Sequence, residues 1–280
     1  MSRIEEALKK ASQMRNSTRR TETFDPPSEE AINRKLVESS VTAEAIERVK
    51  GQHLLVSMND NVSPAAEEFR KLKQNLVRLS KKNGFHNTVL VTSGTVAEGK
   101  SVTATNLAIS LAHEFDHTVL LVDADIRRPS VNHLLNLENT YGLSDCLNDG
   151  TDISKALVPT GIGKLTFLPA GTPTANPGEL LSSKRMEMIL REMKNRYSDR
   201  YVIIDSPPVL PFAETRILSR LVDSTILVVK EGRLSQYEVR DTMEALSGSN
   251  IIGAVFSQAS TGAMRSGYSS SYSYSYYHSY

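Results

Sequence analysis

The stretch that decides the fold is Val89-Leu-Val-Thr-Ser-Gly94-Thr95-Val96-Ala97-Glu98-Gly99-Lys100-Ser101-Val102. A hydrophobic run typical of a buried strand leads into the pattern Gly-x-x-x-x-Gly-Lys-Ser, and a helical pattern of apolar residues follows it. In such a loop, glycines let backbone N–H groups surround a polyphosphate, the lysine adds a mobile cation and the serine offers a hydroxyl to Mg²⁺. We therefore expect residues 94–102 to bind a nucleoside triphosphate.

Composition excludes several classes of protein. Lys and Arg total 33 and Asp and Glu total 32, so no overall charge favours nucleic acid or an anionic membrane. The single cysteine, Cys146, cannot form an internal disulfide and is expected to be a small core residue in a reducing compartment, and the six histidines lack the spacing of zinc ligands. Because no signal peptide and no apolar run of about 18 residues is present, we expect a cytoplasmic protein whose membrane contact, if any, is peripheral.

Further hydrophobic runs predict a parallel sheet. Residues 118–123 and 200–205 read as strands that end in Asp123 and Asp205, Asp125 follows the first of them, and residues 224–230 and 251–256 extend the sheet. Because parallel strands present their carboxyl ends at one edge, the three carboxylates are expected beside the phosphate-binding loop. The predicted fold is an α/β fold of the P-loop NTPase type, with a mostly parallel sheet covered by helices on both faces.

The two ends of the chain differ from this domain. Residues 2–14 predict a short amphipathic helix, which could dock on its own domain, on a partner or at a membrane surface, and residues 15–40 have the composition of a polar linker. We therefore divide the chain into an extension over 1–50, a nucleotide-binding domain over 51–262 and a disordered tail over 263–280. Six of the ten tyrosines stand in the last thirteen residues, at Tyr268, Tyr272, Tyr274, Tyr276, Tyr277 and Tyr280.

Over residues 51–280 the chain resembles the bacterial tyrosine kinases (BY-kinases), P-loop ATPases related to MinD and ParA that phosphorylate a tyrosine cluster at their own C-terminus. Residues 94–101 resemble the Walker A motif of the family, residues 121–127 its Walker A′ motif and residues 202–205 its Walker B motif. Within the family, the chain is similar to the short cytoplasmic autokinases of exopolysaccharide loci, the EpsG-like type associated with exosortase systems. The resemblance implies an ATP-dependent protein-tyrosine autokinase that regulates exopolysaccharide synthesis or export and acts with a separate membrane polysaccharide co-polymerase.

A predicted helix that opens at Ser63-Pro64 carries a charged face with Glu67, Arg70 and Lys73. This face can be an ordinary solvated surface. It also resembles the Glu-x-x-Arg-x-x-Arg motif of the family, which implies self-association into a ring-like homo-oligomer. Lysine at the last position cannot form the bidentate fork of arginine.

The roles of the site residues follow from this hypothesis and from their charges. Lys100 and the backbone of residues 94–102 are expected to hold the phosphates of ATP, while Ser101, Asp205 and Asp123 are the expected Mg²⁺ residues. Asp123 is also the candidate to orient or deprotonate the acceptor tyrosine, with Asp125 in support or in the metal shell. The sequence leaves open which of the two aspartates is the base.

Three positions differ from the relatives. Thr95 stands where MinD and ParA proteins carry a signature lysine, which argues against a positioning ATPase of that type. Ser257 stands where the family often has asparagine near the adenine, and Glu214 where aspartate is usual. Two alternatives to the kinase remain at this stage: a positioning ATPase of the MinD type, and a catalytically weak ATP-binding scaffold.

Overall fold

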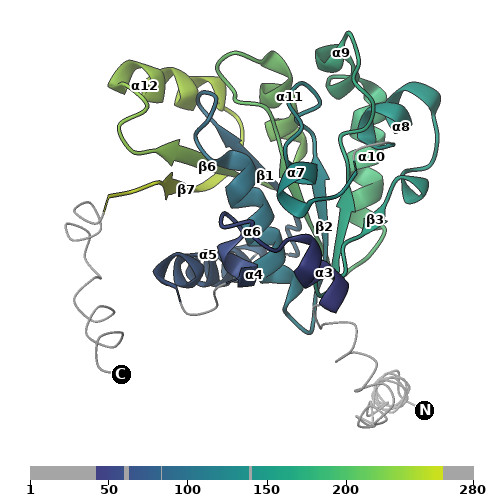
Figure 1. Cartoon of the computed structure of the whole chain (residues 1–280). Helices are drawn as coiled ribbons and strands as arrows, with labels where there is room; N and C mark the ends of the chain where they lie inside the picture. Colours follow the sequence, from purple (N-terminus) through teal and green to yellow (C-terminus); the bar gives the residue numbers. More distant parts are fainter. Residues whose placement is uncertain (1–41, 60–62, 83, 139–140, 261–280) are drawn as a thin grey trace, which may run out of the picture. The chain divides into compact units, whose positions relative to one another are not determined.

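The computed structural model describes residues 42–59, 63–82, 84–138 and 141–260. Its strands are β1 (Thr88–Ser93), β2 (Thr118–Asp123), β3 (Val158–Pro159), β4 (Leu165–Leu168), β5 (Arg200–Asp205), β6 (Ser224–Lys230) and β7 (Ile251–Ser257) (Figure 1). Its helices are α3 (Ala43–Arg48), α4 (Val56–Asn59), α5 (Pro64–Ser80), α6 (Lys100–Ala112), α7 (Val131–Leu135), α8 (Leu143–Asp149), the 3₁₀ turn η1 (Ile153–Lys155), α9 (Pro177–Leu181), α10 (Lys184–Asn195), α11 (Ala213–Leu221) and α12 (Gln236–Ala245). The expected helix over 2–14, the linker over 15–40 and the tyrosine tail over 263–280 lie outside the described residues.

The described strands form one sheet in the order β3-β4-β2-β5-β1-β6-β7. All neighbouring pairs are parallel except β3 and β4, which pair through an antiparallel contact. The five strands predicted from hydrophobic runs occupy the middle of the sheet and one of its edges, and the prediction of a mostly parallel sheet is confirmed. The sequence analysis did not predict β3 or β4.

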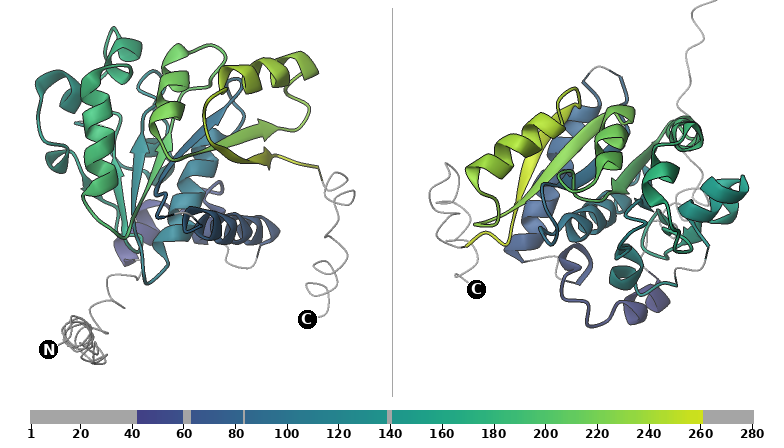
Figure 2. Two further views of the ribbon diagram at one scale, coloured as in Figure 1. Left: turned by 180° about the vertical axis from the view of Figure 1, so that it is seen from behind. Right: turned by 90° about the horizontal axis from the view of Figure 1, so that it is seen from above.

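Helices cover both faces of the sheet, with α5 and α6 on one face and α10 and α11 on the other (Figures 1 and 2). Alternate residues of a central strand accordingly belong to two different apolar clusters. Val89 and Val91 of β1 pack with Leu107 of α6, whereas Leu90 packs with Leu190 of α10. Because both faces are buried, the strand sequences are continuously apolar and do not alternate with polar residues.

Helix α3 joins the core although it precedes residue 51, where the sequence analysis places the start of the nucleotide-binding domain. Ala45 and Val49 are fully buried in the cluster that includes α6. Arg48 donates from Nε to the carbonyl of Leu135 at 3.3 Å, and the Thr42 N–H donates to Gly161 at 2.9 Å. The described core therefore includes residues from 42 onward.

Local sequence signals set the start of helix α5. Ser63 caps α5 by accepting the Ala66 N–H at 3.1 Å, and Pro64 opens the helix as the sequence predicts.

Within the described ranges, no helix is both long and apolar enough to cross a bilayer.

Candidate functional site

The phosphate-binding loop joins the end of β1 to the start of α6. Gly99 precedes α6 with a φ of 91°, a left-handed conformation that glycine adopts at little cost. A Cβ atom at Gly94 would lie 2.7 Å from the Thr242 hydroxyl oxygen and 3.0 Å from Leu234, because α12 and the segment before it pack against the loop. The structure therefore explains why glycine stands at both positions: Gly99 has a left-handed backbone, and a side chain at Gly94 would collide with Thr242 and Leu234.

Glu98 braces this loop from within. Its Oε1 accepts hydrogen bonds from the Thr95 N–H at 2.5 Å and the Thr95 hydroxyl at 2.9 Å, and its Oε2 accepts the Lys230 N–H at 3.2 Å. The Ser257 hydroxyl donates to the Glu98 carbonyl at 2.5 Å. Glu98 is fully buried; its carboxylate holds the loop against the end of β6, and its backbone carbonyl holds it against the end of β7. Ser257, the departure noted in the sequence, contributes to this attachment.

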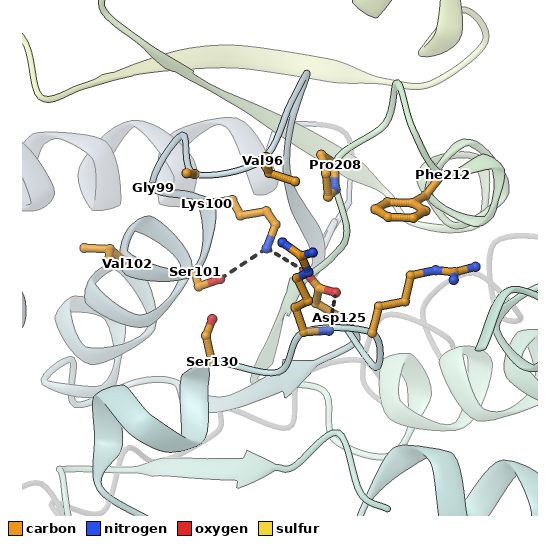
Figure 3. A pocket seen from close by; sticks show the side chains of 12 residues that line it. Val96, Gly99, Lys100, Ser101, Val102, Asp125, Ser130, Pro208 and Phe212 are labelled. Carbon is orange, nitrogen blue, oxygen red and sulfur yellow. Dashed lines mark hydrogen bonds and ion pairs between the residues drawn. The ribbon is translucent and has the colours of Figure 1, made fainter. Parts of the chain in front are cut away.

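The predicted catalytic side chains lie at one edge of the sheet. β2 and β5 are neighbours, and Asp123 and Asp205 are register partners at their carboxyl ends. Lys100 Nζ lies 2.7 Å from Asp125 Oδ2 and 4.0 Å from Asp205 Oδ1. Figure 3 shows the ammonium group of Lys100 directed toward Asp125, with Ser101 beside it.

Asp123 and Asp125 have different surroundings. The Asp123 carboxylate is fully buried and accepts backbone N–H groups from Asp125, Ser130 and Val131, each at 3.1 Å. Burial and the neighbouring carboxylate of Asp205 raise the pKa of Asp123 well above its usual value, although these backbone bonds oppose the rise. Asp123 therefore fixes the turn that carries Asp125.

Asp205 is fully buried. Neither of its carboxylate oxygens accepts a well-formed hydrogen bond among the described residues, although the nearby Ser101 hydroxyl and Ser206 N–H help to lower its pKa. Burial raises its pKa to about 6 despite the nearby ammonium group of Lys100. An orphaned buried carboxylate is a suitable oxygen ligand for a cation. The described residues contain no cluster of three or more His, Cys, Asp or Glu side chains that could hold a metal, but Mg²⁺ needs only one or two carboxylates with water and phosphate oxygens.

Lys100 remains cationic in this environment. Burial lowers its pKa, but the carboxylates of Asp205 and Asp125 more than compensate, and the net shift is upward. Without a polyphosphate, the ammonium group pairs with the carboxylates. A bound polyphosphate offers it a competing set of oxygens.

A cavity of about 330 Å³ opens beside these residues. It is lined by Val96, Ala97, Gly99, Lys100, Ser101, Val102, Asp125, Arg127, Arg128, Ser130, Pro208 and Phe212. Of the predicted aspartates, Asp125 lines it, whereas Asp123 and Asp205 are not among the lining residues. Seven of the predicted loop and catalytic residues thus line the cavity. Val96, Pro208 and Phe212 form an apolar wall of it.

Val96 of this apolar wall belongs to the predicted loop, but Pro208, Phe212 and the ion pair beside Phe212 were not among the predicted site residues. Arg127 Nε lies 2.8 Å from Glu214 Oε1, and the Arg127 guanidinium carbon lies 4.6 Å from the centroid of the Phe212 ring. Arg127 was visible as part of the Walker A′ resemblance and Glu214 as a departure, but nothing in the sequence connects two residues 87 positions apart. Phe212 gave no signal of its own.

The residues expected to mediate self-association lie on α5 and make contacts within the chain. Arg70 pairs with Glu67 at 2.7 Å, and both side chains remain about one-third exposed. Lys73 Nζ pairs with Glu114 at 2.5 Å, and only 16% of the Lys73 side chain is exposed. Lys73 is therefore directed toward its own domain. The six predicted phosphoacceptor tyrosines lie outside the described residues.

Comparison with known proteins places the chain in a family. A model of the AAA domain matches residues 88–247. Tyrosine-protein kinase YwqD of Bacillus subtilis (strain 168) is 34% identical over 206 residues, which cover 73% of this chain and 85% of the relative. Tyrosine-protein kinase etk of Escherichia coli (strain K12) is 30% identical over 198 residues, which cover 70% of this chain but only 27% of the relative. The solved kinase domain of Escherichia coli tyrosine kinase ETK matches with a TM-score of 0.67 at 30% identity, over 74% of this chain and 82% of that one.

The fold and the site define a nucleotide-binding α/β protein of the P-loop class: a parallel sheet delivers a Gly-rich loop, a lysine and three carboxylates to one edge. The comparisons narrow this class. The chain belongs to the bacterial tyrosine-protein kinases. It is an ATP-binding protein-tyrosine kinase.

Proposed function

We propose that this kinase transfers the γ-phosphoryl group of ATP to tyrosines in residues 263–280 of another copy of itself. The observation that carries the proposal is the cavity in which Asp125, an acceptor-side carboxylate, and Lys100 meet the phosphate-binding loop. The end of β7 supports it as well, because the Ser257 hydroxyl donates to the carbonyl of Glu98 in that loop, and the tail follows Ser257 in the sequence. A tail of this length, fully extended at roughly 3.3 Å per residue, would reach about 60 Å, enough for transfer between copies.

In this reaction the phenol oxygen attacks the γ-phosphorus atom, and the bond from that phosphorus to the bridging oxygen breaks. The electron pair leaves with ADP, and the phenolic proton passes to a carboxylate. Free tyrosine has a pKa of about 10, so a proton acceptor is needed at neutral pH. From the sequence, Asp123 is a candidate for this acceptor, and the choice between Asp123 and Asp125 stays open. We assign the role to Asp125, because it lines the cavity while the Asp123 carboxylate is occupied by backbone N–H groups.

The remaining roles follow from charge. Lys100 and the N–H groups of the loop hold the phosphates, and Lys100 exchanges its contact with Asp125 for phosphate oxygens. Asp205 and Ser101 would hold Mg²⁺, since the Asp205 oxygens accept no well-formed hydrogen bond in the described part of the chain. When bound, the ion would neutralise developing charge on the phosphate oxygens. Asp123 supports this site by fixing the turn that carries Asp125.

The biological setting is proposed from the resemblance to the short exopolysaccharide autokinases. We propose that the kinase regulates exopolysaccharide synthesis or export, that a separate membrane polysaccharide co-polymerase activates it, and that it assembles as a homo-oligomer. The exposed pair formed by Glu67 and Arg70 on α5 supports a contact between copies.

The test is to incubate the full-length protein with ATP and Mg²⁺ and to map phosphate by mass spectrometry. The reaction is run with and without the cytoplasmic segment of a co-polymerase. We expect phosphotyrosine in residues 263–280 that is lost in Lys100→Met. ATP hydrolysis without phosphotyrosine under both conditions would instead support a positioning ATPase, and nucleotide binding without either activity would support a scaffold.

A further inference from the structure

We propose that Val96, Pro208 and Phe212 form an apolar slot for the ring of the acceptor tyrosine, and that Arg127 and Glu214 hold Phe212 in place. The inference rests on the proposed transfer to tyrosine and assigns the residues that select an aromatic acceptor. We call these three side chains the ring slot.

The cavity has two chemically distinct sides. Lys100, Ser101 and Asp125 form a polar part of the lining. Val96, Pro208 and Phe212 form an apolar part, beside which Arg127 also lines the cavity. Figure 3 shows Pro208 and Phe212 next to each other at the opposite side of the cavity from Ser101 and Ser130. A polyphosphate needs only the polar side. The apolar side lies where a ring would have to rest while its hydroxyl approaches the phosphate next to Asp125.

The apolar wall is rigidly attached to the phosphate-binding loop. The Val209 N–H donates to the Ser93 carbonyl at 2.8 Å, and the Leu210 N–H donates to the Gly94 carbonyl at 3.1 Å. The hydroxyls of Thr92 and Thr215 both donate to the Pro207 carbonyl at 2.9 Å. The segment from Pro207 to Phe212 therefore keeps a fixed position relative to the loop, as a slot that positions an acceptor requires.

An ion pair contacts Phe212 at the cavity, where Arg127 is itself a lining residue. The Arg127 guanidinium lies against the Phe212 ring, with its carbon 4.6 Å from the ring centroid, and its Nε lies 2.8 Å from Glu214 Oε1. The Glu214 side chain is only 5% exposed, so its charge is screened little by solvent. Gly178 leaves room for the pair, since a Cβ there would lie 3.3 Å from Arg127 and 3.4 Å from Glu214.

This arrangement explains selection of tyrosine over serine. An aromatic ring packed against Phe212 and Pro208 gains contact area and favourable ring geometry, whereas a serine side chain is too short to reach both the wall and the phosphate. Contacts between aromatic rings are worth about 0.5–1.5 kcal/mol, so loss of the Phe212 ring corresponds to a change of about 2- to 13-fold in acceptor affinity.

The kinetic experiment uses a full-length Lys100→Met chain as acceptor for wild-type kinase and for Phe212→Ala. We expect Phe212→Ala to raise the KM for the acceptor by about tenfold, while its affinity for a fluorescent ATP analogue stays unchanged. Ile217→Ala is the matched control, since Ile217 is an apolar residue of α11, the helix that Phe212 directly precedes, is 41% exposed and does not line the cavity. An unchanged acceptor KM in Phe212→Ala would overturn the ring slot.

A binding experiment separates the slot from the proposed function. The full-length chain, with its six tail tyrosines replaced by serine so that they do not compete, is titrated with peptides of residues 263–280 in the presence of a non-hydrolysable ATP analogue. Peptides with tyrosine or phenylalanine should bind about equally, and a serine peptide about tenfold more weakly. Phe212→Ala should abolish this preference. Equal binding of all three peptides by the unmodified slot would overturn the proposal, whereas a ring preference without phosphotyrosine in the wild type would overturn only the proposed function.

The positioning role of Glu214 is tested by a double-mutant cycle. Glu214→Gln alone should reduce the ring preference, and in the Phe212→Ala background it should have no further effect. Additive effects of the two substitutions on the preference would show that Glu214 does not act through Phe212.

Discussion

Ala97 has a left-handed backbone conformation, with a φ of 61° in the middle of the phosphate-binding loop. A Cβ atom makes this conformation costly. We expect Ala97→Gly to raise the free energy of unfolding by roughly 0.5–1 kcal/mol, measured by urea denaturation. In Ala65→Gly, placed on α5, the same chemical change should lower stability. A destabilised Ala97→Gly protein would show that the loop does not store this strain.

Asp205 illustrates the conflict between stability and function at a single residue. A carboxyl group whose folded pKa is raised to about 6 disfavours the folded state above that pH, and the penalty disappears as the pH falls toward its unfolded value. Asp205→Asn should therefore stabilise the metal-free protein by roughly 1–3 kcal/mol at pH 8.

The measurement for Asp205 is thermal unfolding in the presence of a chelator between pH 4.5 and 8. We expect the advantage of Asp205→Asn over the wild type to shrink as the pH falls below about 6, and phosphotyrosine formation to be lost. A variant less stable than the wild type at pH 8 would contradict the account.

Sequence patterns predicted which residues meet at this edge but not how each side chain is occupied. Hydrophobic runs that end in aspartate place Asp123 and Asp205 at neighbouring strand ends, because parallel strands share an edge. The three N–H donors that occupy Asp123, and the contact of Arg127 with Glu214 and Phe212, depend on turns and on pairs far apart in the chain. No periodicity records such contacts, so the different surroundings of Asp123 and Asp125 are visible only in the structure.

At the scale of elements, the sheet is tied together at its amino-terminal edge by Asp223, which directly precedes β6. Its Oδ2 accepts the N–H groups of Asn87 and Thr88 and the hydroxyl of Thr88, and its Oδ1 pairs with Lys194 of α10. Although burial raises the pKa of Asp223, the bonds from Lys194 and Thr88 outweigh this effect and hold it below the usual value.

The stabilising contribution of Asp223 should therefore be present above the ordinary carboxyl pKa of about 4 and lost as the pH falls through the lower, folded value. Asp223→Asn should cost about 2 kcal/mol at pH 7, measured by denaturant unfolding, and progressively less in acid. A cost that is the same at pH 3 and pH 7 would exclude the charge of Asp223 as its origin.

The three charged residues of α5 that the sequence groups as one self-association motif differ in their surroundings. Lys73 pairs with Glu114 of its own chain, while Glu67 and Arg70 form a more exposed pair. We expect Arg70→Ala to weaken self-association in sedimentation velocity at least tenfold more than Lys73→Ala, which should mainly affect the stability of the monomer. Equal loss of the oligomer in both variants would place Lys73 in the contact between copies.

The elements that escaped prediction are short or depend on the rest of the fold. β3 contains two residues and β4 four, and neither is long enough to give a hydrophobic run that differs from a loop. α3 is a six-residue helix that is held by the carbonyls of Leu135 and Thr160, which lie far along the chain. The central strands were predictable because burial on both faces leaves a continuous apolar signature, and α6 was predictable because its apolar residues recur at helical spacing.

At the scale of the whole molecule, one chain carries both the catalytic edge of the sheet and the segment that we propose as its substrate, residues 263–280. The end of β7 contacts the phosphate-binding loop through Ser257 and Glu98. The six tyrosines follow in the sequence between positions 268 and 280. In the proposed transfer between copies, each molecule would be both enzyme and substrate. Assembly would then raise the effective concentration of tails near each site.

The most direct test of this central claim mixes unlabelled wild-type chain with isotopically heavy Lys100→Met chain in the presence of ATP and Mg²⁺. Mass spectrometry of the peptides from residues 263–280 distinguishes the two copies. The account predicts phosphotyrosine on the heavy tail, which only a neighbouring wild-type molecule can supply. Phosphotyrosine confined to the unlabelled tail, or absent from both tails, would contradict it.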